Sequence, residues 1–474
     1  MQGLFNSKRV RALATLSVMA VASVAATVSR ADNVTDAMIG AYVSSGLLEQ
    51  NRALLRVADE GVASSVASLR PVITSALSIA RDYNRTGLGG TLGATSSHST
   101  GATASINMNW LLFDNGASRL TTAAAQESVL ATRQTLLDVE QQVLFAAVQA
   151  YVNVLTQQDI VALRNNNLRL LQEELRAAND RFEVGEVTRT DVALAESQVA
   201  EARANLTDAQ GDLLTARATY EEVVGRAPGN VSAYPPLPRR ANTLASAQAL
   251  AINSHPSLRA QQHAVKAAQL NADSSLREMG PELNLSASAS HSEVHSSDRD
   301  GNNFDIGLSL SQTIYAGGAL ASARRADLAR VDAERGALIS VQRSITANAT
   351  SAYTAFETAA ATLVSSEERV RAAQVAFDGI REEATLGSRT TLDVLQAEQE
   401  LLDAQTARLS ARATQALAAY DLLQAQGLLT AENLNLAVER YDPELYYNQV
   451  RSAPAFVTKR GQDLDRVLKA LRKN

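Results

Sequence analysis

Residues 184–192 read VGEVTRTDV, and residues 386–394 read LGSRTTLDV. Both contain the pattern G-x-x-T-x-x-D-V, which begins at Gly185 and again at Gly387, 202 residues later. Helical repeats of this length accumulate insertions and deletions unless both copies must reach the same level in the structure. The equal spacing is therefore a functional clue. Two further pairs recur at the same offset: Ala150-Tyr151 with Ala352-Tyr353, and Gly116-Ala117 with Gly318-Ala319.

Each copy of this tip-turn motif predicts a tight turn between two long helices. Its glycine can take the left-handed conformation that closes a helix C-terminus. Thr188-x-x-Asp191 and Thr390-x-x-Asp393 are then capping boxes that start the next helix, with Asp in place of the more usual Glu. Capping alone accounts for the glycines and threonines. For the two aspartates and for Arg389, a purely structural role and an additional functional role are equally open alternatives.

The first 31 residues have the order of a cleaved export signal. A basic start precedes an apolar run at 13–28, which at about 16 residues is short for a membrane-spanning helix. Ser29-Arg30-Ala31 is an acceptable cleavage site before Asp32. The segment carries basic and no acidic residues, so its removal makes the net charge of −6 more negative. That balance argues against a nucleic-acid partner.

The chain contains no cysteine, which excludes disulfides, thiolate metal sites, a cysteine nucleophile and a lipid anchor on an N-terminal cysteine. After residue 31 the sequence has no apolar run of the roughly 18 residues that a membrane-spanning helix requires. If the mature protein enters a membrane, it must do so as strands.

The first half of the mature chain, 32–225, predicts the order helix, strand hairpin, long helix, tip turn, helix. A helix is expected at 32–70, ended by Pro71. The other expected elements are strands at 72–83 and 103–113 around a polar loop at 84–101, a long helix at 117–184 and a partner helix at 192–223. In the partner helix, apolar residues alternate in steps of three and four over more than four heptads, which is typical of coiled-coil packing.

The second half, 244–427, repeats this order after a proline-rich linker at 226–243. A helix is expected at 244–278, interrupted near His255-Pro256. The remaining elements are strands at 281–291 and 305–315 around a polar loop at 292–303, a helix of about 65 residues to the second tip, and a helix at 390–427. The tail, 428–474, has a basic end: Lys459, Arg460, Arg466, Lys469, Arg472 and Lys473.

Four strands of about 11 residues are long enough to cross a bilayer when tilted. They alternate apolar with Ser, Thr and Asn, as outer-membrane strands do, although soluble sandwiches also alternate. Four strands cannot close a barrel, so several chains must share one: two copies give a filled barrel of 8 strands, and three give 12 strands around a lumen. Aromatic residues near the helix-side strand ends fit a membrane-interface girdle: Trp110, Phe113 and Tyr315.

The order of elements, the long repeat and the paired G-x-x-T-x-x-D-V motifs resemble the TolC family of outer-membrane channel-tunnel proteins. The resemblance covers essentially the whole mature chain. It implies an α+β membrane protein in which duplicated helical hairpins form a coiled-coil α-barrel across the periplasm. The four strands of each chain would contribute to a trimeric 12-stranded transmembrane β-barrel in outer-membrane lipid. Such homotrimers are exit ducts for efflux or type I secretion, reached through a periplasmic adaptor from an inner-membrane exporter.

The resemblance also assigns a periplasmic gate. An Arg in the family's second tip motif bonds a Thr-Asp pair in the first, and these positions match Arg389, Thr190 and Asp191; Asp393 matches an Asp that lines the constriction. The chain departs from the pattern at Ala384, where the family has a Tyr that helps to hold the closed state. It departs again at Gln396, where the family has a second constriction Asp. The acidic ring would therefore hold three carboxylates rather than six, with weaker cation selectivity.

Competing chemistry has little support in the sequence. His291 and His295, with Asp298 and Asp300, suggest a metal site, but residues four apart on a strand are about 13 Å distant. No catalytic constellation or cofactor motif is evident, so we expect neither an enzyme nor a cofactor. A soluble periplasmic coiled-coil adaptor or scaffold is the alternative function; it explains the helices but not four strands of membrane-spanning length.

Overall fold

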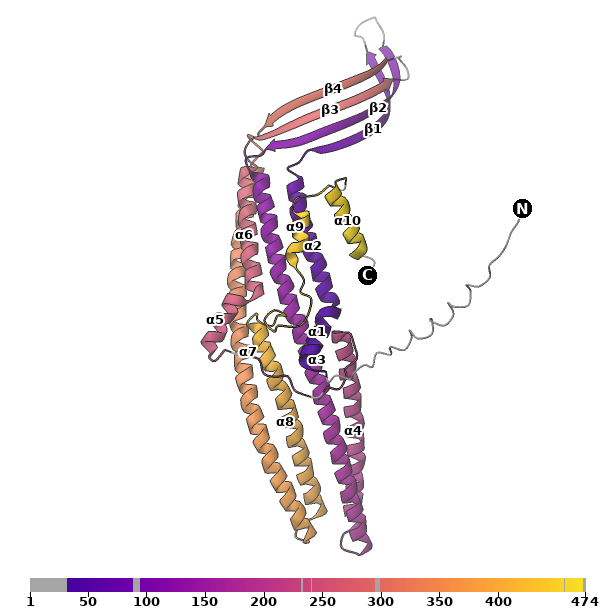
Figure 1. Ribbon diagram of the computed structural model, residues 1–474, viewed down its shortest axis with the longest axis vertical. Helices are drawn as coiled ribbons and strands as arrows, with labels where there is room; N and C mark the ends of the chain where they lie inside the picture. Colours follow the sequence, from indigo (N-terminus) through magenta and orange to yellow (C-terminus); the bar gives the residue numbers. More distant parts are fainter. Residues whose placement is uncertain are drawn as a thin grey trace, which may run out of the picture.

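The computed structural model describes residues 32–87, 94–231, 233–239, 241–294, 299–455 and 457–471. The export segment predicted at 1–31 lies outside this part of the chain. A sheet occupies one end of the molecule, two helical tips occupy the other, and long helices run between them (Figure 1). Among the described residues, no helix is both long enough and apolar enough to span a bilayer.

The helices of the first half are α1 (Val34–Ser44), α2 (Gly46–Ala67), α3 (Ala117–Glu183) and α4 (Arg189–Val224). The prediction of one continuous helix over 32–70 is wrong, because the chain breaks at Ser45. The Ser45 side chain accepts a hydrogen bond from the N–H of Leu48 and so caps the start of α2. Serine favours such caps because its hydroxyl satisfies a backbone donor that the helix leaves free.

The second half contributes α5 (Leu244–Ser254), α6 (Pro256–Arg277), α7 (Ala319–Thr385) and α8 (Thr391–Ala425), and the tail contributes α9 (Pro443–Val450) and α10 (Lys459–Leu471). The predicted interruption at His255-Pro256 is confirmed, with Pro256 at the first position of α6, where its missing N–H costs nothing. The helices α3 and α7 have 67 residues each and begin after Gly116 and Gly318, both in the left-handed region.

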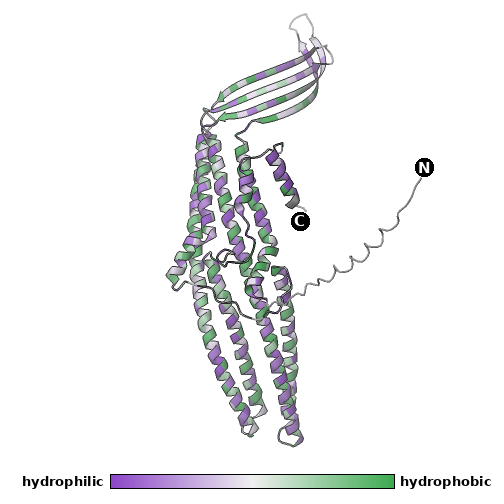
Figure 2. Ribbon diagram, in the orientation of Figure 1, coloured by the Kyte–Doolittle hydropathy of each residue, from purple (hydrophilic) through white to green (hydrophobic). Residues whose placement is uncertain are grey.

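The long helices α3 and α7 organise the packing. Toward the tips, α3 packs on α4 and α7 on α8; toward the sheet, α6 lies against both α3 and α7, and α2 lies against α3. The helices carry hydrophobic residues in stripes rather than all round (Figure 2). On α4, Val192, Ala195, Val199 and Ala202 are buried, so the alternating steps of three and four do form its packed seam.

The four strands are β1 (Val72–Gly87), β2 (Ala94–Phe113), β3 (Glu282–Val294) and β4 (Arg299–Ser311). They form one antiparallel sheet in the order β1-β2-β3-β4. Most of the stretches predicted as polar loops at 84–101 and 292–303 are in fact strand, so the strands are longer than expected. Their Ser and Thr residues favoured the prediction of a loop, but in the structure the backbone of β1 and β2 is paired from Val72↔Asn109 to Gly87↔Ala94.

The strand predicted at 305–315 is wrong at its C-terminal end. The strand β4 stops at Ser311, which pairs with Glu282, the first residue of β3. Pro281 precedes Glu282 and has no N–H to offer, so the ladder has no partner for later residues. Tyr315 therefore lies beyond the strand in the connection to α7, with 86% of its side chain exposed.

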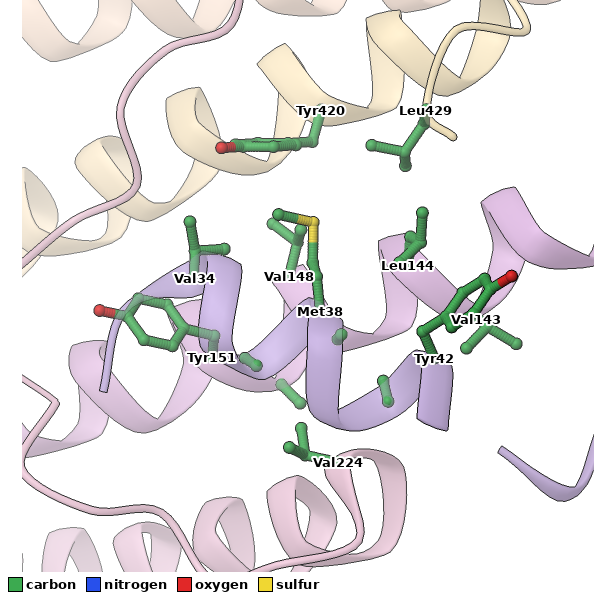
Figure 3. Packing of buried hydrophobic residues seen from close by; sticks show 14 of the residues in the cluster. Val34, Met38, Tyr42, Val143, Leu144, Val148, Tyr151, Val224, Tyr420 and Leu429 are labelled. Atoms are coloured by element: carbon green, nitrogen blue, oxygen red, sulfur yellow. The ribbon is translucent and has the colours of Figure 1, made fainter. Parts of the chain in front are cut away.

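The largest hydrophobic core lies midway along the molecule, where α1 crosses α3 (Figure 3). Val34 and Met38 of α1 meet Val148 of α3, and Tyr420 of α8 closes the cluster from the second half. The tyrosines around this level hold the linker at 226–243. Tyr151 donates to the carbonyl oxygen of Ala233 (2.8 Å), and its repeat counterpart Tyr353 donates to that of Asn242 (3.4 Å).

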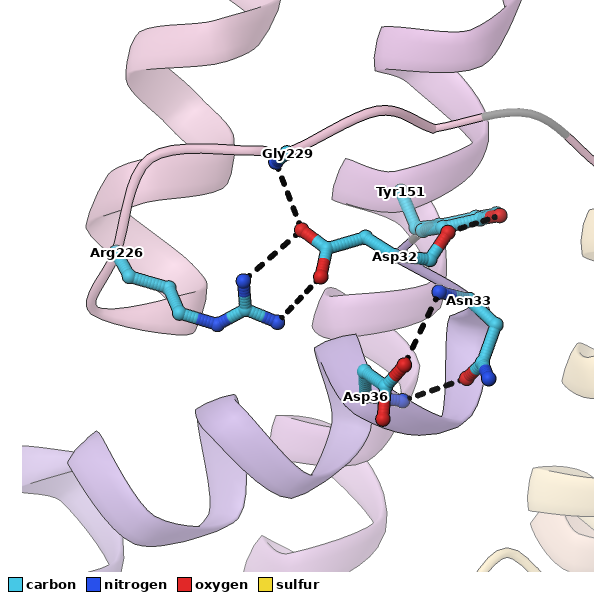
Figure 4. Close-up of polar contacts among 6 residues, drawn as sticks. All are labelled: Asp32, Asn33, Asp36, Tyr151, Arg226 and Gly229. Carbon is cyan, nitrogen blue, oxygen red and sulfur yellow. Dashed lines mark hydrogen bonds and ion pairs between the residues drawn. The ribbon is translucent and has the colours of Figure 1, made fainter. Parts of the chain in front are cut away.

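An ion pair holds the first described residue against the end of α4 (Figure 4). Both carboxylate oxygens of Asp32 accept bonds from Arg226 at 2.9 Å, and the N–H of Gly229 adds a third at 2.8 Å. Burial alone would raise the pKa of Asp32, but the bonds from Arg226 and Gly229 outweigh it and hold that pKa below its usual value. The predicted cleavage site thus directly precedes an anchored residue.

Gly427, which follows α8, packs closely against His255, the residue between α5 and α6. Its φ is +73°, and an added Cβ would lie 2.6 Å from Cα of His255. We predict that Gly427→Ala lowers the thermal unfolding midpoint, because the left-handed conformation alone costs about 1–2 kcal/mol with a Cβ. The measurement is thermal unfolding of the purified protein followed by circular dichroism at one scan rate.

The matched control is Gly336→Ala on α7, where a Cβ meets nothing within 4 Å. This change should leave the midpoint unchanged or raise it, because alanine favours a helix interior by about 0.5–1 kcal/mol over glycine. Equal midpoints for both variants would contradict the proposed contact.

Candidate functional site

The two tips have the same construction. Gly185 and Gly387 close α3 and α7 with φ of +83° and +75°. At the first tip, the Thr188 hydroxyl accepts from the N–H of Asp191 (3.3 Å), and the Asp191 carboxylate accepts from the N–H of Thr188 (2.8 Å). Both capping boxes predicted from the motif therefore form.

The same reciprocal bonds join Thr390 and Asp393 at 3.2 and 2.9 Å. They leave both aspartates ionised at neutral pH. The hydroxyl and then the N–H of Thr188 lower the pKa of Asp191, and the N–H and then the hydroxyl of Thr390 lower that of Asp393. Each tip thus presents a fixed carboxylate at the start of its second helix.

Within one chain, Arg389 bonds its own hairpin. Its Nε donates to Oε2 of Glu383 at 2.8 Å, and this bond raises the pKa of the guanidinium. Glu383 was not predicted from the sequence, although a carboxylate six residues before the arginine, across a tight turn, was a usable signal. The expected bond from Arg389 to Thr190 and Asp191 of the other hairpin is not formed among the described residues of one chain, and it stays a prediction for an assembly.

The two departures from the family pattern lie in different surroundings. Ala384 is 8% exposed and packs inside the hairpin against Phe377 and Val394, so it presents nothing to the other hairpin. Gln396 is exposed on α8, five residues into the helix.

The sheet at the opposite end has one apolar and one polar face. Directly paired residues on neighbouring strands share a face. One such row is Ala289 with Phe304, and the next is Ala287 with Ile306. Phe304 and Ile306 are 72% and 68% exposed, so the chain itself does not cover this face. Apolar residues of the other strands continue it: Ile73, Leu77, Ile79, Ile106, Met108, Leu283, Leu285, Leu308 and Leu310.

The predicted girdle aromatics are placed unequally. Trp110 lies near the helix-side end of β2, and its indole N–H donates to the carbonyl oxygen of Leu69 at 3.0 Å. Phe113 is the last residue of β2 and Tyr315 lies beyond β4. All three are at the sheet end nearest the helices, but only two are on a strand.

The described residues do not support the suggested metal site. His291 pairs through Nδ1 with Oδ1 of Asn302 at 2.9 Å. His295 and Asp298 lie outside the described residues. Within the described ranges, no group of three His, Cys, Asp or Glu side chains is arranged to hold a metal ion.

The architecture and the sequence agree with known proteins. The family model of the outer membrane efflux protein matches residues 41–226 and 248–428. The chain belongs to this family. The outer membrane efflux protein BepC of Brucella suis biovar 1 (strain 1330) is 37% identical over 422 residues, which are 89% of this chain and 91% of BepC. Proteins named TolC also match, which confirms the expected family.

Two other relatives extend the comparison. The alkaline protease secretion protein AprF of Pseudomonas aeruginosa PAO1 is 26% identical, covering 64% of each chain. The outer membrane protein VceC of Vibrio cholerae has the same fold, with a TM-score of 0.70 at 18% identity over 83% of this chain and 96% of VceC. The protein is therefore an outer-membrane exit duct in a family of channel and transport proteins, and the soluble scaffold alternative is wrong.

The capping box at the first tip can be tested separately from any gate. We predict that Thr188→Ala speeds amide hydrogen exchange in the first turn of α4, because loss of a threonine cap costs a helix about 1 kcal/mol. Exchange of peptides that cover residues 186–195 is the measurement. Thr188→Ser, which keeps the hydroxyl, should exchange like the unchanged protein. Equal protection in Thr188→Ala would contradict a role for the box.

Proposed function

We propose that three copies of this chain form a continuous duct from the periplasm through the outer membrane. The proposal rests on the sheet. It exposes one apolar face, and within the described part of the chain the outer edges of β1 and β4 have no strand partner. Unpaired backbone groups in hydrocarbon cost several kcal/mol each, so these edges need strands of other copies. Three sheets supply 12 strands, enough for a barrel with a lumen.

The same symmetry would place six helical hairpins around one axis. Two hairpins of each copy would then form the wall of a periplasmic tunnel, with all tips at its far end. Three Asp393 carboxylates would line the narrow neck and favour cations over anions. The bonds from Thr390 support this role, because they fix each carboxylate in its ionised form.

The tip is proposed to be a gate in which Arg389 exchanges partners. In the closed assembly Arg389 would bond Thr190 and Asp191 of the other hairpin type. In the open assembly it would return to Glu383, the partner it has in a single chain. A charge-assisted bond of this kind is weak enough at an exposed site for a partner that binds the open state to break it.

The partners proposed for opening are a periplasmic adaptor and an inner-membrane exporter. The duct would be passive, without a catalytic step, and would take its cargo from the exporter. Relatives named for efflux and for alkaline protease secretion support two classes of cargo, the substrates of efflux and secreted proteins.

Single-channel conductance in planar bilayers tests the gate. We predict that Arg389→Ala and Asp191→Asn each raise conductance several-fold, because each removes one side of the lock. Asparagine keeps an oxygen that can accept from Thr188, so the second variant preserves the cap. Glu383→Gln should lower conductance or leave it low, because it removes the partner that competes for Arg389.

Arg371→Ala is the matched control, since Arg371 is exposed on α7 far from the tip. It should conduct like the unchanged protein. Equal conductance in all variants would leave the duct in place but reject Arg389 as its lock. The absence of any conductance from folded protein would reject the duct.

A further inference from the structure

A buried polar contact joins the two hairpins between the tip turns and the middle of the molecule. The Nδ2 of Asn167 on α3 donates to Oε1 of Glu398 on α8 at 2.9 Å. Glu398 is 3% exposed and Asn167 is 7% exposed. Between the middle of the molecule and the tips, the two hairpins meet mainly through α3 and α8. This bond therefore lies in the interface that must change if the hairpins separate.

The surroundings of this contact are unfavourable for a charge. Leu171 and Leu395 pack together one turn closer to the tips and seal the interface from that side. The second carboxylate oxygen of Glu398, Oε2, is buried and has no hydrogen-bond partner within the described part of the chain. Burying an ionised carboxylate in this state costs far more free energy than burying a protonated carboxyl group, which carries no charge.

The charged side chains around Glu398 do not compensate for its burial. Glu174 on α3 repels the ionised form, and Arg381 on α7 attracts it. However, Arg381 is already paired with Glu174, its Nε lying 3.5 Å from Oε1 of that residue. Among the described residues, Glu398 thus has one neutral hydrogen-bond donor, Asn167, and no cation that is not already paired.

Within a single chain, the hairpin alone does not bury a glutamate at this position, as the internal repeat shows. Glu196 occupies the equivalent position on α4, 202 residues earlier, and is exposed. Both helices form the same capped, packed seam with glutamate at this position. The difference arises because α8 faces α3 of the other hairpin at this point.

We propose that Glu398 is a proton-operated latch between the two hairpins, in which the protonated acid holds α8 against α3 and the ionised acid weakens that interface. The proposal rests on the proposed gate in one respect only: separation of the hairpins is taken to open the duct. It adds a second control point, distinct from Arg389 and from the tip turns.

The direction of the pH dependence follows from the burial. Burial raises the pKa of Glu398 to about 7 in the packed interface; the Asn167 bond opposes this and Glu174 adds to it. In separated hairpins the carboxyl would return toward its ordinary value of 4.5. The packed state is therefore most favoured below that value, loses stability as the pH rises toward 7, and stays weakest above it.

The distance between the hairpins tests the latch directly. The chain has no cysteine, so spin labels can be attached to Asp180→Cys on α3 and Gln399→Cys on α8, both at exposed positions. Pulsed electron paramagnetic resonance on the full-length assembly measures the distance between the two labels of one chain, which should be short near pH 5. Near pH 8 a longer distance should gain roughly 70-fold in population relative to the short one, as a pKa of about 7 in the packed interface and 4.5 in separated hairpins imply.

Two variants separate the latch from other titrating groups. Glu398→Gln imitates the protonated acid and should keep the short distance at both pH values. Glu196→Gln, at the equivalent position on α4, leaves the contact between α3 and α8 intact and should retain the full pH response of their distance. An unchanged distance between pH 5 and pH 8 in the parent protein would overturn the proposal, and so would an equal response in Glu398→Gln.

Conductance measured on the same samples distinguishes this proposal from the gate. If the distance responds to pH through Glu398 while conductance does not, the latch stands and the proposed gating by hairpin separation fails. If Arg389→Ala raises conductance but the distance ignores pH, the tip lock stands and the latch fails.

Discussion

The unpaired edges of the sheet constrain everything else in this molecule. A strand edge in hydrocarbon leaves N–H and C=O groups without partners, and the apolar face beside it cannot remain in water. The described residues of one chain form four strands, with β1 and β4 at the open edges. In the proposed assembly, the strands are therefore completed by other copies around a common axis. Because the helices continue from the strand ends, they must be arranged around that axis as well.

This constraint gives a physical reason for the internal repeat. Copies of a hairpin that stand around one axis can close its far end only if they reach similar heights. The helices α3 and α7 have equal length, each starting after a left-handed glycine and ending before another. At mid-length, Tyr151 and Tyr353 tie the two long helices to the same linker. The residue pairs that recur at one offset are thus those that fix the start, the middle and the end of each long helix.

Much of this could be predicted because the signals are local. A glycine, a Thr-x-x-Asp box and steps of three and four define helix ends and seams without knowledge of the fold. The strand ends were less predictable, because Ser and Thr in β1 and β2 read as loop until a paired strand is present. Tertiary contacts were beyond the sequence: Glu196 and Glu398 occupy equivalent positions, yet only the second is buried, by a helix more than 200 residues away.

The central claim is that the sheet is completed by two further copies of the chain. Native mass spectrometry of the protein, extracted from the outer membrane in mild detergent, measures the number of chains directly. The account predicts one dominant species with three chains, because three sheets are needed for a barrel with an open lumen. A stable folded monomer, or a dimer as the dominant species, would contradict it.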